Sequence, residues 1–344
     1  ESYLATNLMQ RANEIATAVA TDPVGANDVA PGALHPISPA DVAGTNDLAS
    51  VVRAQLKLFH NMRAALHVPD QPPPASPPNG PGRNDPWRIL SYSLLGVQTK
   101  PGQIKFGIVW NEDQRTWVHV DGNTRSPIIR NLAASLGLGA PLSGHTGDLD
   151  FAAVERQTAL SEIIRPPRYP WAIDRTAAGR GANSYRMNCA ACHDGPQSDK
   201  RLHAVAEIKT DPNRAEIFTP EIAEKFNQFF AELQIPGYTP PKQPPLRGTQ
   251  KYWAPSLAGA WARSPYLHNG SVRTMSDLLT RPDLRAQLFH RGSRTYDAAQ
   301  MGYADEGAYI LDTVKPGNSN AGHNFGAGLK DAEKRELIEY LKTL

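Results

Sequence analysis

Both cysteines of this 344-residue chain lie in one five-residue motif, Cys189-Ala-Ala-Cys192-His193. Two thiols one helical turn apart can form thioether bonds to the two vinyl groups of a haem, and a histidine directly after them can bind the iron from one side. The motif therefore predicts one covalent haem c, attached through Cys189 and Cys192, with His193 as the proximal iron ligand. No thiol is left for a disulfide framework.

Three other uses of this motif have to be compared with haem attachment. A thioredoxin-like redox pair follows a strand in a βαβ setting, whereas the residues before Cys189 have a helical pattern. A structural zinc site needs four ligands, usually from two pairs of cysteine or histidine, and this chain has no second pair. A chance occurrence would not be expected to use both cysteines of the chain. Covalent haem is the interpretation that accounts for all three residues.

The residues around the motif support the same interpretation. Gly181 and Tyr185 precede Cys189, while Leu337 and Tyr340 lie near the C-terminus in a helical pattern. Glycine lets two backbones approach closely, and aromatic packing can close the edge of a porphyrin. This arrangement resembles class I cytochrome c, in which the first helix crosses the last helix at such positions. The resemblance implies that Tyr185 belongs to the haem surroundings.

A proline-rich segment, Arg165-Pro-Pro-Arg-Tyr-Pro170, interrupts the helical pattern of apolar residues along the chain. We expect a cytochrome c domain with covalent haem over residues 171–344. Residues 1–170 would form a diverged N-terminal cytochrome-like domain without a haem motif. The chain has 30 prolines and 27 glycines, so we expect a mainly α, loop-rich fold, with a few short strands around Ile104 to Val120.

Apolar residues at helical spacing predict the individual helices. These are Glu14–Ala20, Val51–Leu66, Ile128–Leu136, Ala177–Met187, Glu221–Leu233 and Asp331–Leu344. Asp331 is expected to be the N-cap of the last helix. The proline-rich tracts Gln71–Pro86 and Pro236–Pro245 are expected to lack regular structure.

An electron-carrying haem usually has a second axial ligand, which is a histidine or a methionine. Six residues after the motif have a suitable side chain: His203, His268, Met275, His290, Met301 and His323. Residue type alone does not choose among them.

Several segments resemble one protein superfamily. Tyr266–Leu279, with its Leu-His-Asn-Gly-Ser sequence, is similar to a segment of bacterial dihaem cytochrome c peroxidases. Phe289–Gly292, Gly317–Gly326 and Val109–Asp113 resemble the rubber-oxygenase-like branch of that superfamily. The resemblance extends over about Val109 to Leu344 and is strongest in the second half.

The resemblance implies a haem with two histidine ligands, the second of which lies in the Gly-His stretch near the C-terminus. His323 occupies that position here, so it is the expected distal ligand. Two alternatives stay open: His323 could be an ordinary loop histidine, and Met301 could be the ligand, which would raise the redox potential. His268 is expected to shape the haem surroundings or to be a structural histidine in a turn.

The chain departs from this superfamily in one respect. Its members carry two haems, whereas this sequence has one haem motif. Either the first domain has lost its haem, or a segment before Glu1 carried it. The histidines of the first half have no neighbouring thiols, so a noncovalent haem there is not favoured; they are His60, His67, His119 and His145. Asp148 and Asp150 are candidates for a calcium site.

Charge and hydropathy exclude some classes of function. The formal net charge is +2, from 36 basic and 34 acidic residues, and no basic run suggests nucleic-acid binding. No stretch approaches the roughly 20 apolar residues of a transmembrane helix. The chain begins with Glu1 and has no apolar leader, so we expect a mature or trimmed product. Because covalent haem of this type is attached outside the cytoplasm, we expect an exported protein of the periplasm or cell exterior.

The sequence supports three hypotheses about function. The first is electron transfer by a six-coordinate haem that exchanges electrons with redox partner proteins. The second is an oxidoreductase of the peroxidase or dioxygenase type, or a fragment of one, with an open iron or with a second haem upstream of residue 1. The third is a subunit of a larger redox complex. The second rests on family likeness alone, which does not establish an activity.

Overall fold

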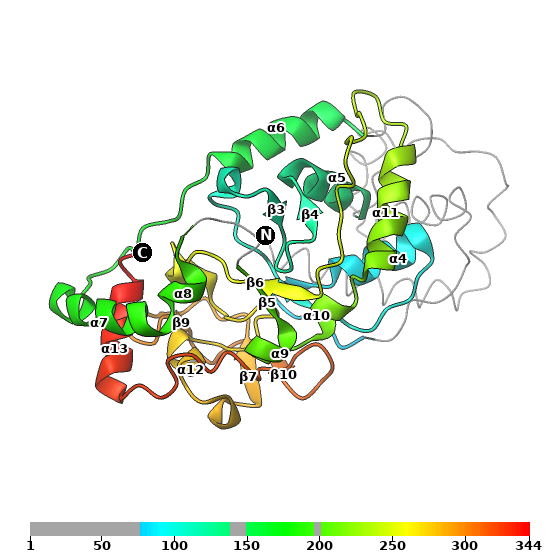
Figure 1. Ribbon diagram of the computed structural model, residues 1–344. Coiled ribbons are helices and arrows are strands. Elements are labelled where there is room, and N and C mark those ends of the chain that lie inside the picture. The colour runs from blue at the N-terminus through cyan, green and yellow to red at the C-terminus, as the bar shows by residue number, and fades with distance from the viewer. Residues whose placement is uncertain (1–75, 138–148, 196–200) are drawn as a thin grey trace, which may run out of the picture.

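The computed structural model describes residues 76–137, 149–195 and 201–344. The helices predicted within residues 14–20 and 51–66 lie outside these ranges. The described chain is built from helices joined by long loops and short strand pairs (Figure 1). This agrees with the expected mainly α, loop-rich class. The predicted division into two domains at residue 170 stays a prediction.

The elements follow one another in a fixed order. The first half contains β1 (Arg83–Asn84), α4 (Pro86–Leu95), β2 (Ile104–Lys105), η1 (Glu112–Gln114), β3 (Trp117–Val118), β4 (Thr124–Arg125), α5 (Pro127–Gly137) and α6 (Phe151–Glu162). The middle contains α7 (Arg175–Asn188), α8 (Ala190–His193), β5 (Leu202–Ala204), α9 (Val205–Ile208), α10 (Asn213–Glu216), α11 (Pro220–Glu232) and β6 (Lys251–Trp253). The last part contains η3 (Ala260–Arg263), α12 (Met275–Leu278), η4 (Pro282–Leu284), β7 (Leu288–Arg291), β8 (Tyr296–Asp297), β9 (Gly302–Tyr303), β10 (Tyr309–Asp312) and α13 (Asp331–Leu341).

The strands form antiparallel pairs rather than an extended sheet. The pairs are β1 with β2, β3 with β4, β5 with β6, β7 with β10 and β8 with β9. The β5–β6 pair sets His203 opposite Tyr252, and the β7–β10 pair sets Phe289 opposite Leu311. Pairs this short are marginal alone, so their register depends on the packing around them.

One hydrophobic core is formed by α4, α5, α6 and α11. Trp87 of α4 is buried and lies against Phe218 and Phe226, with ring centres 4.3 Å and 5.2 Å away. Proline is tolerated at the start of a helix because its missing N–H would be unpaired there, so Pro86 begins α4. Figure 1 shows α11 beside α4, although more than a hundred residues separate them in sequence. Chain from both sides of residue 170 therefore shares this core.

A second core surrounds the crossing of α7 and α13 (Figure 1). Leu337 is fully buried, and the rings of Tyr185 and Tyr340 have centres 5.0 Å apart. At Gly181 the two backbones nearly touch, because a Cβ atom there would lie 2.0 Å from the carbonyl oxygen of Glu336. The crossing expected from Gly181, Tyr185, Leu337 and Tyr340 is therefore confirmed.

Two glycines of α7 allow a matched test of this crossing. We expect Gly181→Ala to lower the free energy of unfolding by at least about 2 kcal/mol, since the added methyl group overlaps backbone that cannot move aside. A methyl group at Gly179 would meet nothing within 4 Å. Gly179→Ala should raise stability by up to about 1 kcal/mol through helix propensity. Urea unfolding of both variants measures the difference, and equal stabilities would contradict the close crossing.

The predicted helices at Ile128–Leu136, Ala177–Met187 and Glu221–Leu233 are confirmed as α5, α7 and α11. The last helix is also present, but its predicted N-cap is wrong. Lys330 holds the cap position, and its N–H donates to the Glu333 carboxylate at 2.8 Å. Asp331 is the first residue of the helix instead.

The sequence patterns missed several of the observed elements, among them helices α4 and α6 and strand β1. Helix α4 was missed because Pro86 looked like the end of a proline-rich tract, and β1 lies within that tract. Helix α6 begins at Phe151, directly after the candidate calcium ligand Asp150, whose carboxylate accepts the N–H of Ala153 at 2.9 Å. This is the ordinary role of an aspartate N-cap. Among the described residues, no helix combines the length and apolar character needed to cross a membrane.

Candidate functional site

The two cysteines and His193 lie where α7 turns into α8. Cys189 lies between the two helices, as the C-cap of α7 and the N-cap of α8. Its backbone N–H donates to the Tyr185 carbonyl at 2.8 Å, and its own carbonyl accepts the N–H of His193 at 3.0 Å. These bonds bring Cys192 one turn further along the chain. Burial raises the pKa of the Cys189 thiol to about 11 and also raises that of Cys192. Both side chains are free thiols that line one cavity.

This cavity has a volume of about 1360 Å³ and lies between the first half of the chain and the α7–α13 region. Its wall is mostly apolar and includes Trp87, Leu257 and Leu337. Such a volume exceeds that of most small-ligand pockets, which are about 300–1,000 Å³. The cavity can therefore hold a large, flat, apolar group.

His193 is fixed in one orientation inside this cavity. Its Nδ1 lies 2.7 Å from the carbonyl oxygen of Pro255. Because a carbonyl can only accept, Nδ1 carries the proton, and Nε2 keeps the free lone pair that a metal requires. Burial above all, together with the nearby charges of Arg263 and Arg201, lowers the pKa of His193 to about 4, against the opposing effect of the hydrogen bond to Pro255. The neutral imidazole is thus favoured near pH 7.

His323 lies opposite His193 across the cavity. The ring centres are 6.3 Å apart, and the ring planes are inclined by 55°. Burial lowers the pKa of His323 to about 4. Its Nδ1 is buried and has no hydrogen-bond partner among the described residues. A buried polar atom without a partner requires an explanation.

The separation of the two rings fits a shared metal. A bond from a metal to an imidazole nitrogen is about 2 Å long, and the centre of a five-membered ring with bonds of about 1.3 Å lies about 1.1 Å from each ring atom. Two imidazoles bound to one metal from opposite sides would therefore have centres about 6.2 Å apart. The His193–His323 pair matches this distance. With both thiols on the same cavity, the donor set fits a covalent haem.

Met301, the alternative ligand, occupies a different place. It is fully buried within the second hydrophobic core and does not belong to the cavity wall. Its carbonyl oxygen accepts the Tyr266 hydroxyl at 2.9 Å. The sulfur is thus part of the packing beside α12.

The sequence also predicted that His268 and Tyr185 belong to the haem surroundings, and the structure places them in different positions. His268 lines the cavity and stacks on Tyr252, with ring centres 4.2 Å apart; burial lowers its pKa to about 3. Tyr185 packs behind the cysteine motif and does not line the cavity. Its hydroxyl donates to the Asp194 carboxylate, and burial raises its pKa.

The remaining candidate ligands, His203, His290 and Met275, also line the cavity. His203 and His290 lie beside the carboxylates of Glu207 and Asp305, each at 3.2 Å. Met275 is buried at the start of α12. His60, His67, His145 and Asp148 lie outside the described residues. Within the described ranges, no cluster of three or more His, Cys, Asp or Glu side chains could hold a metal ion, and calcium stays a prediction.

Three further side chains line the site: His119, which the sequence analysis named only among the histidines of the first half, and Arg115 and Arg263, which have no signal in the sequence. His119 lines the cavity, and its Nδ1 lies 2.8 Å from the Asn123 amide oxygen. Arg115 and Arg263 also line the cavity, and neither forms an ion pair among the described residues. Isolated arginines and histidines are common in sequences, so only the fold shows that these face one cavity.

The comparisons with known proteins agree with this class of site. Residues 251–290 match the family model described as RoxA-like, cytochrome c-like. A cytochrome c-like domain implies a haem-based redox function. The matched segment contains His268 but neither the cysteine motif nor His323.

Three relatives have been found. The uncharacterized proteins y4iJ and y4iM of Sinorhizobium fredii (strain NBRC 101917 / NGR234) are 30% and 31% identical to this chain, over 70% and 68% of its length. Cytochrome-c peroxidase IdrP1 of Denitromonas iodatirespirans is 23% identical over 56% of the chain and 48% of its own length. The chain spans 54% of y4iJ and 63% of y4iM. Together these similarities support a relationship to cytochrome c peroxidases and RoxA-like proteins.

Proposed function

We propose that this protein transfers electrons through one haem c, attached to Cys189 and Cys192 and bound axially by His193 and His323. The observation that carries the proposal is the pair of opposed imidazoles, whose centres are 6.3 Å apart in the cavity that both thiols line. If His193 and His323 both bound the iron, no substrate would reach the metal directly. The proposal therefore favours electron transfer over chemistry at the iron.

Each residue has a distinct part in this function. The haem would supply a one-electron couple of its iron. The Pro255 carbonyl holds the Nδ1 proton of His193 and so makes the other ring nitrogen a better donor. Arg115 and Arg263 would hold the carboxylates of the group, and their positive charge favours its reduced form. The apolar wall excludes water, which strengthens these electrostatic effects.

A haem peroxidase, or a part of one, is the second candidate. It is favoured by the similarity to a named cytochrome-c peroxidase and by the extent of the cavity. The wall continues from the His193–His323 pair to Trp87 and His119, which leaves room beyond a single haem. Such a protein would need an open iron, or a second haem on chain that precedes residue 1.

Haem counting combined with spectroscopy separates the two candidates. The sample is the protein made in a host that attaches haem c. For electron transfer we expect about one haem per chain by pyridine haemochrome, a low-spin ferric EPR signal and slow cyanide binding. A high-spin signal with rapid cyanide binding, or turnover of peroxide with an electron donor, would assign the protein to the second candidate. Colourless protein would contradict both.

The cellular setting follows from the same proposal. Haem attachment of this kind implies export, so the protein would act in the periplasm or outside the cell with redox partner proteins. The long loops and the first half of the chain could serve as docking surface in a larger redox complex. Copurification of the tagged full-length protein from its native host would test this setting.

A further inference from the structure

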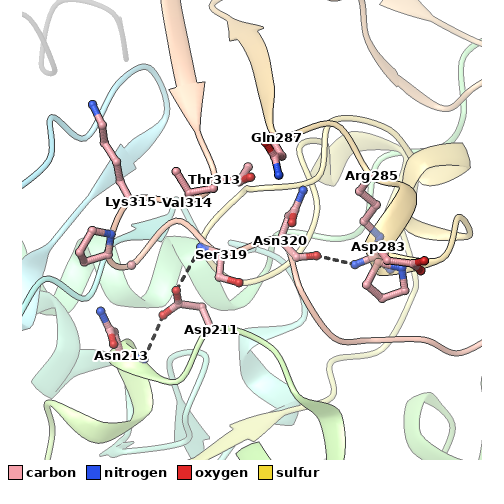
Figure 2. A pocket seen from close by; sticks show the side chains of 13 residues that line it. Asp211, Asn213, Asp283, Arg285, Gln287, Thr313, Val314, Lys315, Ser319 and Asn320 are labelled. Carbon is pink, nitrogen blue, oxygen red and sulfur yellow. Dashed lines mark hydrogen bonds between the residues drawn. The ribbon is translucent and has the colours of Figure 1, made fainter.

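Arg285 is a buried arginine just after η4, and it forms no ion pair among the described residues. Its guanidinium instead donates to main-chain carbonyls. Nη1 donates to Asn320 at 2.7 Å and Gly322 at 2.9 Å, while Nη2 donates to His323 at 3.2 Å. On its other side, the same group donates to the carbonyls of Leu278 and Thr280. Figure 2 shows Arg285 beside Asn320.

The segment that carries His323 belongs to no helix or strand. Its main chain is held on both sides of the turn. The N–H of His323 donates to the Ile208 carbonyl at 2.8 Å, and the N–H of Ser319 donates to the Asp211 carboxylate at 3.1 Å (Figure 2). The Ser319 carbonyl accepts from Asn269 and Ser271, each at 2.9 Å. Gly322 lies directly against the backbone of Lys209. Three of the four carbonyl groups in the 320–323 turn, those of Asn320, Gly322 and His323, accept hydrogen bonds from Arg285.

The backbone of His323 is also in an unfavourable conformation, with φ of 49°. A residue with a side chain is disfavoured in this left-handed region, because its Cβ atom lies too close to the following carbonyl oxygen. Such a conformation persists only where the surroundings enforce it. Because Arg285 binds the carbonyl of His323 itself, it opposes relaxation of the residue toward ordinary backbone angles.

From these contacts we infer that Arg285 is a positioning residue: it holds the 320–323 turn so that the His323 imidazole faces His193. The inference rests on the proposed function, since it assigns Arg285 a role in placing the distal ligand. Arginine suits this role because its planar fork has five N–H donors in fixed directions. Lysine would keep the charge but would not reach carbonyls on both sides at once.

The test compares Arg285→Lys and Arg285→Gln with Arg281→Lys in the full-length holoprotein. Arg281 is a suitable control because it lies on the same segment, is exposed, and pairs with Asp283. The readouts are the ferric EPR spectrum, the cyanide-binding rate and the melting temperature. For both Arg285 variants we expect a high-spin component and about tenfold faster cyanide binding, at unchanged haem content. Added imidazole should restore the low-spin spectrum, and Arg281→Lys should behave like the wild type.

The outcomes separate this inference from the proposed function. If Arg285→Gln does not fold, Arg285→Lys, which keeps the charge and most of the volume, still decides. A Lys variant that melts earlier but keeps the wild-type spectrum and cyanide rate would overturn the inference, because Arg285 would then only stabilise the fold. Failure of the proposed ligand would appear elsewhere, as an unchanged spectrum in His323→Ala.

Discussion

Replacing both Cys189 and Cys192 with serine is expected to abolish covalent haem attachment. Each thioether bond needs a thiol, and the chain has no others. Haem content after acid–acetone extraction should fall from about one per chain to none. The variants with a single serine should keep one thioether bond. In the reduced state, their haem absorption band should be shifted from that of the wild type. Pyridine haemochrome and haem staining of denaturing gels measure both effects.

A neighbouring residue supplies the control for this experiment. Met187 lies two positions before Cys189 and is 78% exposed, so Met187→Leu should keep full haem content. Because the haem would bind only the folded chain, its loss should also lower the melting temperature. If the double serine variant retained haem that resists extraction, the attachment site would lie elsewhere and the proposed function would fail.

The second large effect is expected at His323. His323→Ala should turn a low-spin ferric haem into a high-spin one and accelerate cyanide binding by about 100-fold or more, because one axial position opens. His323→Met should keep six ligands but raise the midpoint potential, since thioether ligation favours the reduced iron. EPR, stopped-flow cyanide binding and redox titration measure these changes.

Met301 provides the matched comparison for His323. Met301→Leu conserves volume in the core, which usually costs less than about 1.5 kcal/mol, and should leave the spectrum unchanged. The opposite pattern, a high-spin Met301→Leu with a wild-type His323→Ala, would make the methionine the ligand. The fully buried position of Met301 outside the cavity wall argues for the first pattern.

The organisation around residue 170 illustrates the limits of local patterns. A proline-rich break did suggest a boundary there, and helix α11 was predicted at nearly its observed place. The element against which α11 packs was not predictable, because the sequence around Phe226 and Phe230 does not indicate which hydrophobic core contains them. Packing of α11 against Trp87 depends on the three-dimensional path of the chain between them.

The sequence by itself determined what depends on neighbouring residues along the chain. The cysteine motif predicts the attachment chemistry because its atoms lie within one helical turn, and Gly181 predicts a close helix crossing because only glycine allows it. Tertiary structure decided which distant groups meet: the family resemblance had named His323 as the expected distal ligand with Met301 as the alternative, whereas nothing in the sequence pointed to Arg285. The tertiary structure set His323 rather than Met301 opposite His193, and it brought Arg285 to the carbonyls of the His323 turn. The Arg285 contacts join loop residues far apart in sequence, and loops have no periodicity from which such a meeting could be predicted.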